Sequence, residues 1–192
     1  MGGEITWRCG GNGGYIFELV FYRDCNGAEV NVLSENLRVW NHPTLTNITV
    51  NFISRTDISP SCTQVSGGPQ PLDCGVGSNG GNGIGANERI LYRSNEIMMA
   101  GTPPTQGWIF TYENFARSNA ITNLNNPSTY GMTIAATMFA VGGNSGCQDN
   151  SPQFQQAPYF VSCVGDPFVY NMNAVDPDQD SLFIEFATPL NN

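Results

Sequence analysis

Apolar runs of about four to eight residues recur along the whole chain and are separated by stretches rich in Gly, Asn and Pro. Asn47–Ile53 alternates aliphatic or aromatic side chains with polar ones, which is the period of a half-buried β-strand. Tyr15–Tyr22 is a continuous apolar run with many aromatic and β-branched residues, bounded by turn-forming segments. Both patterns predict strands.

The same criteria predict more strands, whereas a helical period is absent apart from one turn near Tyr112–Asn119. Short strands punctuated by loops predict an all-β fold, an antiparallel β-sandwich of Ig-like type with long loops. We expect residues 1–166 to form this sandwich domain, and residues 167–192 to be the truncated start of a second Ig-like or cadherin-like module. The further strands are predicted at Glu4–Trp7, Leu37–Asn41, Arg89–Tyr92, Trp108–Tyr112, Met132–Phe139, Phe168–Asn171 and Leu182–Phe186.

Charged residues make up only 12% of the 192-residue chain, against about 25% in an average protein. The net charge is −9, and all seven basic residues are Arg. This balance argues against nucleic acid and anionic membranes as partners. No apolar run reaches the roughly 20 residues of a membrane-spanning helix, so we expect no direct membrane insertion. A strand pattern begins at Glu4, so we expect that an exported chain has already lost its signal peptide.

Six cysteines indicate an oxidising, extracellular environment. With no Cys-x-x-Cys pair and a single His, a zinc site is disfavoured. Six cysteines allow 15 pairings, and six free thiols in a cytosolic protein is the alternative. Pairing in sequence order is the simplest arrangement, and each bridge would then close a loop of roughly 11–17 residues, worth about 3 kcal/mol. The predicted disulfides are Cys9–Cys25, which would tie together the ends of the Tyr15–Tyr22 strand unit, Cys62–Cys74 and Cys147–Cys163.

Three carboxylates alternate at Asp176, Asp178 and Asp180. Hard oxygen ligands on one side of an extended loop suit Ca²⁺, which would also relieve their mutual repulsion. The spacing is not that of an EF-hand, because the sixth position lacks Gly and the twelfth lacks Glu. Further ligands would come from a neighbouring loop or module, such as Asn171 or Asn173. The alternative is a metal-free turn in which the aspartates accept backbone hydrogen bonds.

Catalytic signals are weak. His42 is the single His, it precedes Pro43, and no nucleophile motif accompanies it. The other carboxylates are scattered, and turn caps or solvated faces explain them. We therefore predict a protein that is not an enzyme and has no catalytic residues.

Two features could form a binding surface. The Gly- and Asn-rich segment Ser66–Asn87 is long enough to be a binding loop or a mobile one. A phosphate-binding loop is disfavoured because no Lys-Ser/Thr pair follows the glycines. Some aromatic side chains could stack on sugars, although a sandwich of this size needs most of them in its core.

A set of motifs distributed in order along the chain carries a family resemblance. The chain resembles the N-terminal region of large Bacteroidetes cell-surface proteins, gliding-motility-associated or adhesin-like, which the type IX secretion system exports. The resemblance implies a longer polypeptide with Ig-like or cadherin-like repeats and a C-terminal sorting domain, and it supports the local cysteine pairing. In one departure, Phe115–Ser118 stands where relatives often carry Cys-Cys-Arg-Asn. The matching stretches are Met1–Trp7, Tyr22–Gly27, Ile53–Cys62, Tyr92–Asn95, Gly101–Pro104, Gly107–Trp108, Asp149–Phe154 and Asn173–Leu182.

Residues and resemblance together predict a non-enzymatic, secreted adhesin module on the outer cell surface, acting in gliding motility or attachment. Its partner would be a glycan, a surface or another cell-surface protein, and calcium would stiffen the junction between modules. One alternative is a self-associating subunit of an extracellular filament, assembled through β-strand contacts. A third possibility is a carbohydrate-binding accessory module.

Overall fold

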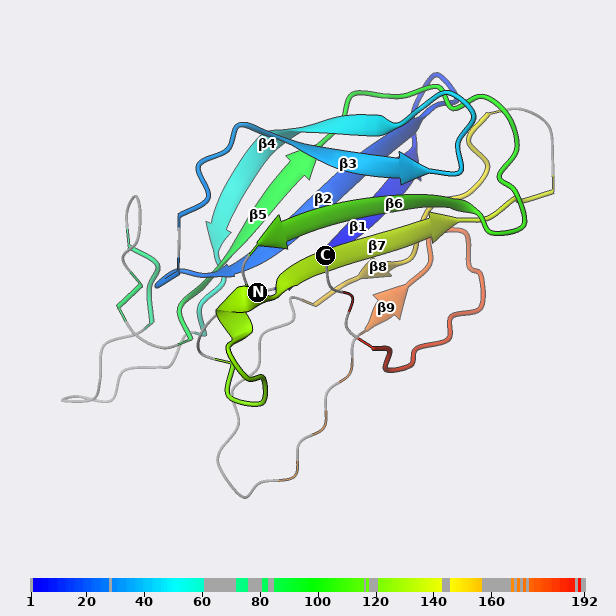
Figure 1. The fold of residues 1–192 in the computed structure, drawn as a ribbon. Coiled ribbons are helices and arrows are strands. Elements are labelled where there is room, and N and C mark those ends of the chain that lie inside the picture. The colour runs from blue at the N-terminus through cyan, green and yellow to red at the C-terminus, as the bar shows by residue number, and fades with distance from the viewer. Residues whose placement is uncertain are drawn as a thin grey trace.

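A computed structural model describes residues 2–27, 29–60, 72–75, 81–82, 85–115, 117, 121–142, 146–156, 167, 169, 171, 173–188 and 190. Seven strands form one sheet, and two short strands form a second (Figure 1). Within these residues the helical structure is a single 3₁₀ turn, η1 (Pro127–Thr129). The strands are β1 (Gly2–Cys9), β2 (Tyr15–Asp24), β3 (Ser34–Trp40), β4 (Asn47–Asp57), β5 (Asn87–Arg93), β6 (Trp108–Phe115), β7 (Gly131–Met138), β8 (Gln153–Phe154) and β9 (Ala174–Val175).

The large sheet has the order β1-β2-β5-β4-β3-β6-β7, and every neighbouring pair is antiparallel. The sheet curls until its two edge strands, β1 and β7, lie side by side (Figure 1). The approach is close: a Cβ atom added to Gly3 would lie 2.5 Å from Ile134 Cδ1. The result is a nearly closed all-β domain. The all-β, antiparallel prediction is confirmed, while the Ig-like assignment stays a prediction.

The core fills the inside of this curled sheet. Period-2 alternation turns Phe17, Leu19 and Phe21 of β2 inward, and each is at most 1% exposed. Aromatic rings dominate the packing, with the centroids of Phe17 and Phe110 4.7 Å apart. Such pairs contribute about 0.5–1.5 kcal/mol beyond the area they bury. Most of the aromatic residues are therefore core, as the sequence predicted.

An ion pair is buried at one end of the core. Arg23 Nε lies 2.9 Å from Glu88 Oε1, and both side chains are at most 5% exposed. Arg55 approaches the other carboxylate oxygen at 3.3 Å. Because Arg23 shares the inward face of β2 with Phe21, the pair occupies a position where the strand period places a core residue.

Seven of the predicted strands coincide with β1 to β7, and the other predictions do not all hold. The turn near Tyr112–Asn119 is wrong at its start, because β6 continues to Phe115. Leu182–Phe186 is wrong as a strand: the segment pairs with no other strand, and Phe183 and Phe186 are 86% and 103% exposed. A strand needs a partner for its backbone groups, and the described residues supply none here. Phe168–Asn171 lies partly outside the described residues.

The local disulfide pairing is wrong. Cys9 is bonded to Cys147, and Cys25 is bonded to Cys74. The predicted Cys9–Cys25 bridge fails because these residues lie at opposite ends of the β1–β2 hairpin: Cys9 faces Tyr15, whereas Cys25 follows Asp24. Ten strand residues span roughly 33 Å, far beyond the roughly 7 Å that a disulfide can bridge between Cα atoms.

The other two predicted bridges fail for the same reason, that a partner is already taken. Cys74 is bonded to Cys25 and Cys147 to Cys9, so neither is available for Cys62–Cys74 or Cys147–Cys163. Cys62 and Cys163 lie outside the described residues. Both observed bridges join segments distant in sequence, separated by 138 and 49 residues. Two disulfides of this kind indicate an oxidising, extracellular environment.

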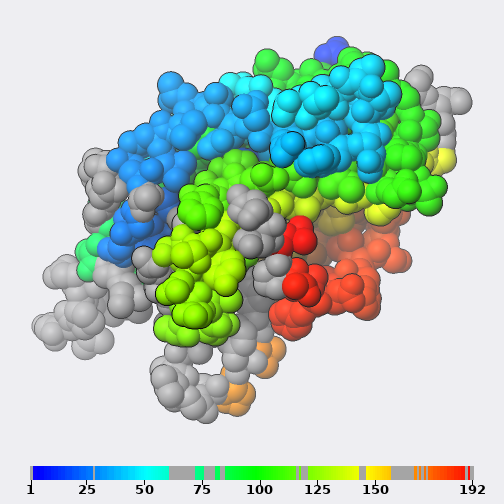
Figure 2. Space-filling model, in the orientation of Figure 1, coloured from blue at the N-terminus to red at the C-terminus, as the bar shows by residue number. Residues whose placement is uncertain are grey.

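Contacts cross the predicted domain boundary near residue 166. β8, from the first predicted domain, pairs with β9, from the second. The Leu190 carbonyl accepts hydrogen bonds from the Thr133 N–H of β7 at 3.4 Å and from Arg117 Nη2 at 2.9 Å. In Figure 2 the red C-terminal residues lie against this part of the molecule. The described residues after 166 therefore pack onto the first domain, whatever larger module they belong to.

Candidate functional site

The segment 147–154 runs antiparallel along the outer edge of β1 and positions the polar residues that follow. Ser151 and Trp7 exchange hydrogen bonds, from Ser151 N–H to Trp7 O at 3.0 Å and from Trp7 N–H to Ser151 Oγ at 2.8 Å. The Cys9 N–H donates to Asn150 Oδ1 at 2.8 Å, beside the Cys9–Cys147 disulfide. Covalent and hydrogen-bonded ties thus fix this segment at the sheet edge.

Asp176, the first of the three predicted calcium ligands, is buried and organises a tight turn. Its Oδ1 accepts the N–H groups of Asp178 at 2.8 Å and Asp180 at 3.2 Å, and its carbonyl accepts the Gln179 N–H. Gln179 takes a positive φ of 68°, which such a turn requires. This is a turn in which an aspartate caps its own backbone.

Asp178 ties the turn to the β1 edge. Its carboxylate accepts the Asn150 N–H at 2.6 Å and the Asn150 side-chain amide at 3.0 Å. These charge-assisted bonds connect residues that are 28 positions apart in sequence. The aspartate loop therefore braces the chain after residue 166 against the sheet.

In the described part of the chain, no three His, Cys, Asp or Glu side chains converge as metal ligands. Oxygens of Asp176 and Asp178 are instead occupied by N–H donors, which is the metal-free turn that the sequence left open. Of the suggested extra ligands, Asn171 Oδ1 accepts the Asn173 N–H and the Asn173 carbonyl accepts the Gln155 N–H. Calcium binding by Asp176, Asp178 and Asp180 stays a prediction.

Asp149 adds a fourth carboxylate to this region, and the sequence reading did not single it out. Partial burial raises the pKa of Asp149, and the negative charges of Asp178, Asp176 and Asp180 raise it further. No cation contributes to this balance. Asp149 thus lies in a locally negative field without a counter-charge.

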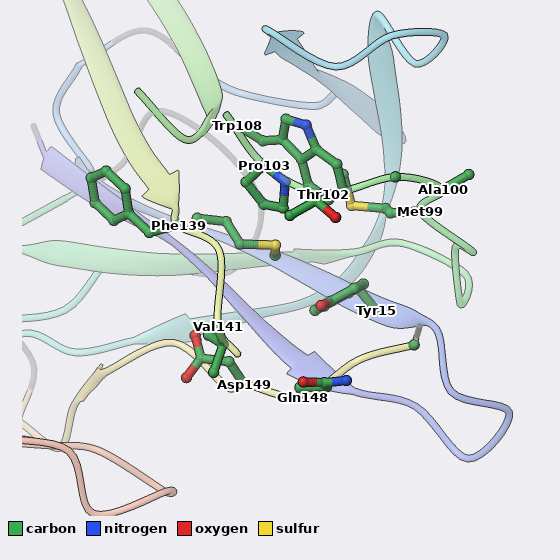
Figure 3. A pocket seen from close by; sticks show the side chains of 13 residues that line it. Tyr15, Met99, Ala100, Thr102, Pro103, Trp108, Phe139, Val141, Gln148 and Asp149 are labelled. Atoms are coloured by element: carbon green, nitrogen blue, oxygen red, sulfur yellow. The ribbon is translucent and has the colours of Figure 1, made fainter. Parts of the chain in front are cut away.

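A pocket of about 290 Å³ opens beside Asp149 (Figure 3). Its walls come from the end of β7 and the following loop, the loop after β5, the start of β2 and the segment 146–149. In Figure 3, Val141, Gln148 and Asp149 lie across the opening from Trp108, Pro103 and Thr102. The remaining lining residues are Tyr15, Met99, Ala100, Gly101, Met138, Phe139 and Gly146.

Tyr15 supplies a hydroxyl to the pocket wall. An isolated bridge holds its backbone against Ile97, with hydrogen bonds of 2.9 Å in both directions. Burial raises the pKa of Tyr15, a hydrogen bond with the Gln148 backbone lowers it, and the Asp149 charge raises it. At ordinary pH the hydroxyl is therefore neutral and able to donate or accept a hydrogen bond.

His42 serves a structural purpose in the described structure. Its Nδ1 accepts the N–H groups of Thr44 at 3.2 Å and Leu45 at 2.9 Å, and its ring lies 4.6 Å from that of Trp108. Burial lowers the pKa of His42, which favours the neutral form that these hydrogen bonds need. The turn interpretation of the sequence fits this position.

Most of the Ser66–Asn87 loop lies outside the described residues. Two of its described pieces meet where the Asn82 N–H donates to the Asp73 carbonyl at 3.0 Å and the Asp73 N–H donates to Asn82 Oδ1 at 2.8 Å. The sequence signal that could have found the pocket was the stretch Asp149–Phe154, which was noted for its resemblance and not for chemistry.

Comparisons with protein-family models, with curated proteins and with solved structures gave no significant match for this chain. Among the described residues, no helix has the length and apolar character needed to cross a bilayer. The site must therefore be interpreted from its own chemistry.

Proposed function

We propose that the chain is a non-enzymatic adhesin module, secreted to the outer cell surface, that acts by binding in gliding motility or attachment. The observation that carries the proposal is the pair of long-range disulfides, which lock a weakly charged β-domain of net charge −9. Such bridges suit a protein that must keep its shape outside the cell. The resemblance to Bacteroidetes surface proteins points in the same direction.

The pocket and the loops around it give this module a surface for contact. Phe139 and Val141 on its rim are 59% and 51% exposed, which favours binding over a purely structural role for this end of the domain. In this proposal the aspartate loop acts as a brace, with or without calcium, that holds the following chain in place.

Adhesion can be tested with fluorescent beads coated with the oxidised chain. Under flow, these beads should be retained on glycan-coated, polysaccharide-coated or cell-covered surfaces, and soluble chain should compete with them. Beads carrying an unrelated disulfide-bonded β-domain of similar net charge serve as the control. Retention no greater than the control on every surface would refute the adhesin function.

The second candidate, a filament subunit, draws support from the exposed apolar segment Leu182–Phe186. Strand addition at β1 has less support, because the segment 147–154 already occupies its outer edge. Sedimentation velocity over a range of concentrations, with and without calcium, tests self-association. A chain that stays monomeric throughout would exclude the filament.

The third candidate, a carbohydrate-binding accessory module, would use the aromatic residues of the pocket. Trp108 and Tyr15 are only 2% and 8% exposed, so neither presents an open ring face for stacking on a sugar. A glycan array with no signal above background would count against this candidate.

A further inference from the structure

The pocket beside Asp149 is small for a ligand site. Its volume of about 290 Å³ lies at the lower end of the roughly 300–1,000 Å³ that ligand pockets span. An oligosaccharide would not fit, whereas one group of the size of an amino-acid side chain would. The pocket is therefore suited to a single inserted group.

The electrostatics of the pocket select for a cation. Asp149 is the one charged residue among those that line it, and no Arg takes part. The charged groups that act on Asp149 are the carboxylates of Asp176, Asp178 and Asp180. An anionic ligand would be repelled by all four, and a cation would supply the charge that the protein does not provide.

The rest of the wall is apolar and adaptable. Met99, Met138, Val141 and Phe139 offer thioether, aliphatic and aromatic surface to a hydrocarbon stem. Methionine side chains adjust their shape easily, which suits the packing of a flexible methylene chain. Charge at one end and apolar surface along the side match an ammonium group on an alkyl chain.

We propose that this pocket binds an alkylammonium group, either the side chain of a lysine on a partner protein or a small free amine, with the ammonium at Asp149 and the methylenes against Met99 and Met138. This chain contains no Lys, so the group must come from another molecule. The proposal deepens the adhesin function and rests on it in one respect, that the pocket faces an extracellular partner.

Methyl NMR of the oxidised protein labelled at its methionine methyl groups tests the proposal. The probes are n-butylammonium, the peptide acetyl-Gly-Lys-Gly-amide and the same peptide acetylated at Nε, all in the presence of a calcium chelator. The methyl signals of Met99 and Met138 should shift saturably with the first two probes. Met132, which is not among the lining residues of the pocket, is the internal control and should stay unchanged.

The ammonium charge is isolated by one substitution and its matched control. Asp149→Asn should weaken binding by at least about tenfold, because it removes the charged partner. Glu113→Gln on β6 changes the net charge equally but does not line the pocket, so its affinity should equal that of the wild type. The acetylated peptide makes the same comparison on wild-type protein and needs no folded variant.

Three results would overturn the proposal. They are no saturable shift with either ammonium probe, equal affinity for the acetylated peptide, and loss of ammonium binding in calcium with Met138 shifted by the metal itself. If the peptide binds more tightly than butylammonium, a partner's lysine is the source, and the reverse points to a free amine. Ammonium binding without bead adhesion would refute the adhesin function alone, and adhesion without ammonium binding would refute this pocket assignment alone.

Discussion

Removing the Cys9–Cys147 disulfide should destabilise the domain more than any other single crosslink change described here. The bridge closes a loop of 138 residues, for which the chain-entropy relation gives about 5 kcal/mol. Removal of native disulfides typically costs about 2–5 kcal/mol, so the calculated value is an upper bound. Against a total stability of about 5–15 kcal/mol for a domain, this loss is large.

The perturbation is the double variant Cys9→Ser/Cys147→Ser, and the assay is equilibrium unfolding in urea under non-reducing conditions. We expect the free energy of unfolding to fall by about 2–5 kcal/mol. The slope with urea should rise, because the unfolded chain loses a constraint and expands. The variant Cys25→Ser/Cys74→Ser opens a shorter loop of 49 residues, worth about 4 kcal/mol by the same relation, and should lose less.

Two results would refute this reasoning. Non-reducing peptide mapping that links Cys9 to Cys25 would show that the assumed connectivity is wrong. An unchanged urea midpoint in the Cys9→Ser/Cys147→Ser variant would show that the hydrogen bonds between β1 and the segment 147–154 hold this edge without the covalent tie.

Four further predictions follow from local contacts. Gly3→Ala should cost about 1–3 kcal/mol in thermal unfolding, since its Cβ would collide with Ile134, and an equal stability of the variant would contradict the seam geometry. Because the folded-state pKa of His42 is lowered, its contribution to stability is present above about pH 6.5 and lost as the pH falls through the folded pKa; urea midpoints from pH 7.5 to 5.5 should show this fall, and His42→Gln should flatten it. Removing the Glu88 carboxylate with Glu88→Ala should cost about 3–5 kcal/mol in urea unfolding, because Arg23 stays buried without this counter-charge; a loss below 1 kcal/mol would argue against the buried pair. If calcium binds the aspartate loop, a chelator should lower the melting temperature of the wild type and leave that of Asp178→Asn unchanged, whereas identical melting with and without chelator would favour the metal-free turn.

The cysteine pairing shows where sequence reasoning stopped short. The pattern had already placed a strand between Cys9 and Cys25, and an extended strand separates its two ends too far for a disulfide. That observation was sufficient to reject the pair. It could not identify Cys147 as the true partner, because nothing near Cys9 in sequence records which distant segment lies at the edge of β1.

The candidate site divides in the same way. The aspartate spacing predicted a turn or a metal loop, and Asp176 does cap a turn through two backbone N–H groups. Neither the bond from Asn150 to Asp178 nor the presence of Asp149 beside the pocket could be predicted. Both depend on the segment 147–154 reaching the β1 edge.

By itself, the sequence determined the strand positions, the all-β class and the low-charge, cysteine-containing chemistry of an extracellular protein. These properties are local: a period of two along the chain and a composition that any fold would keep. Only the tertiary structure decided the disulfide partners, the curl that brings β1 beside β7, and the pocket with its single uncompensated carboxylate. Each of these depends on which surfaces meet across 138 residues of chain, and that choice is made by the packing of the whole core.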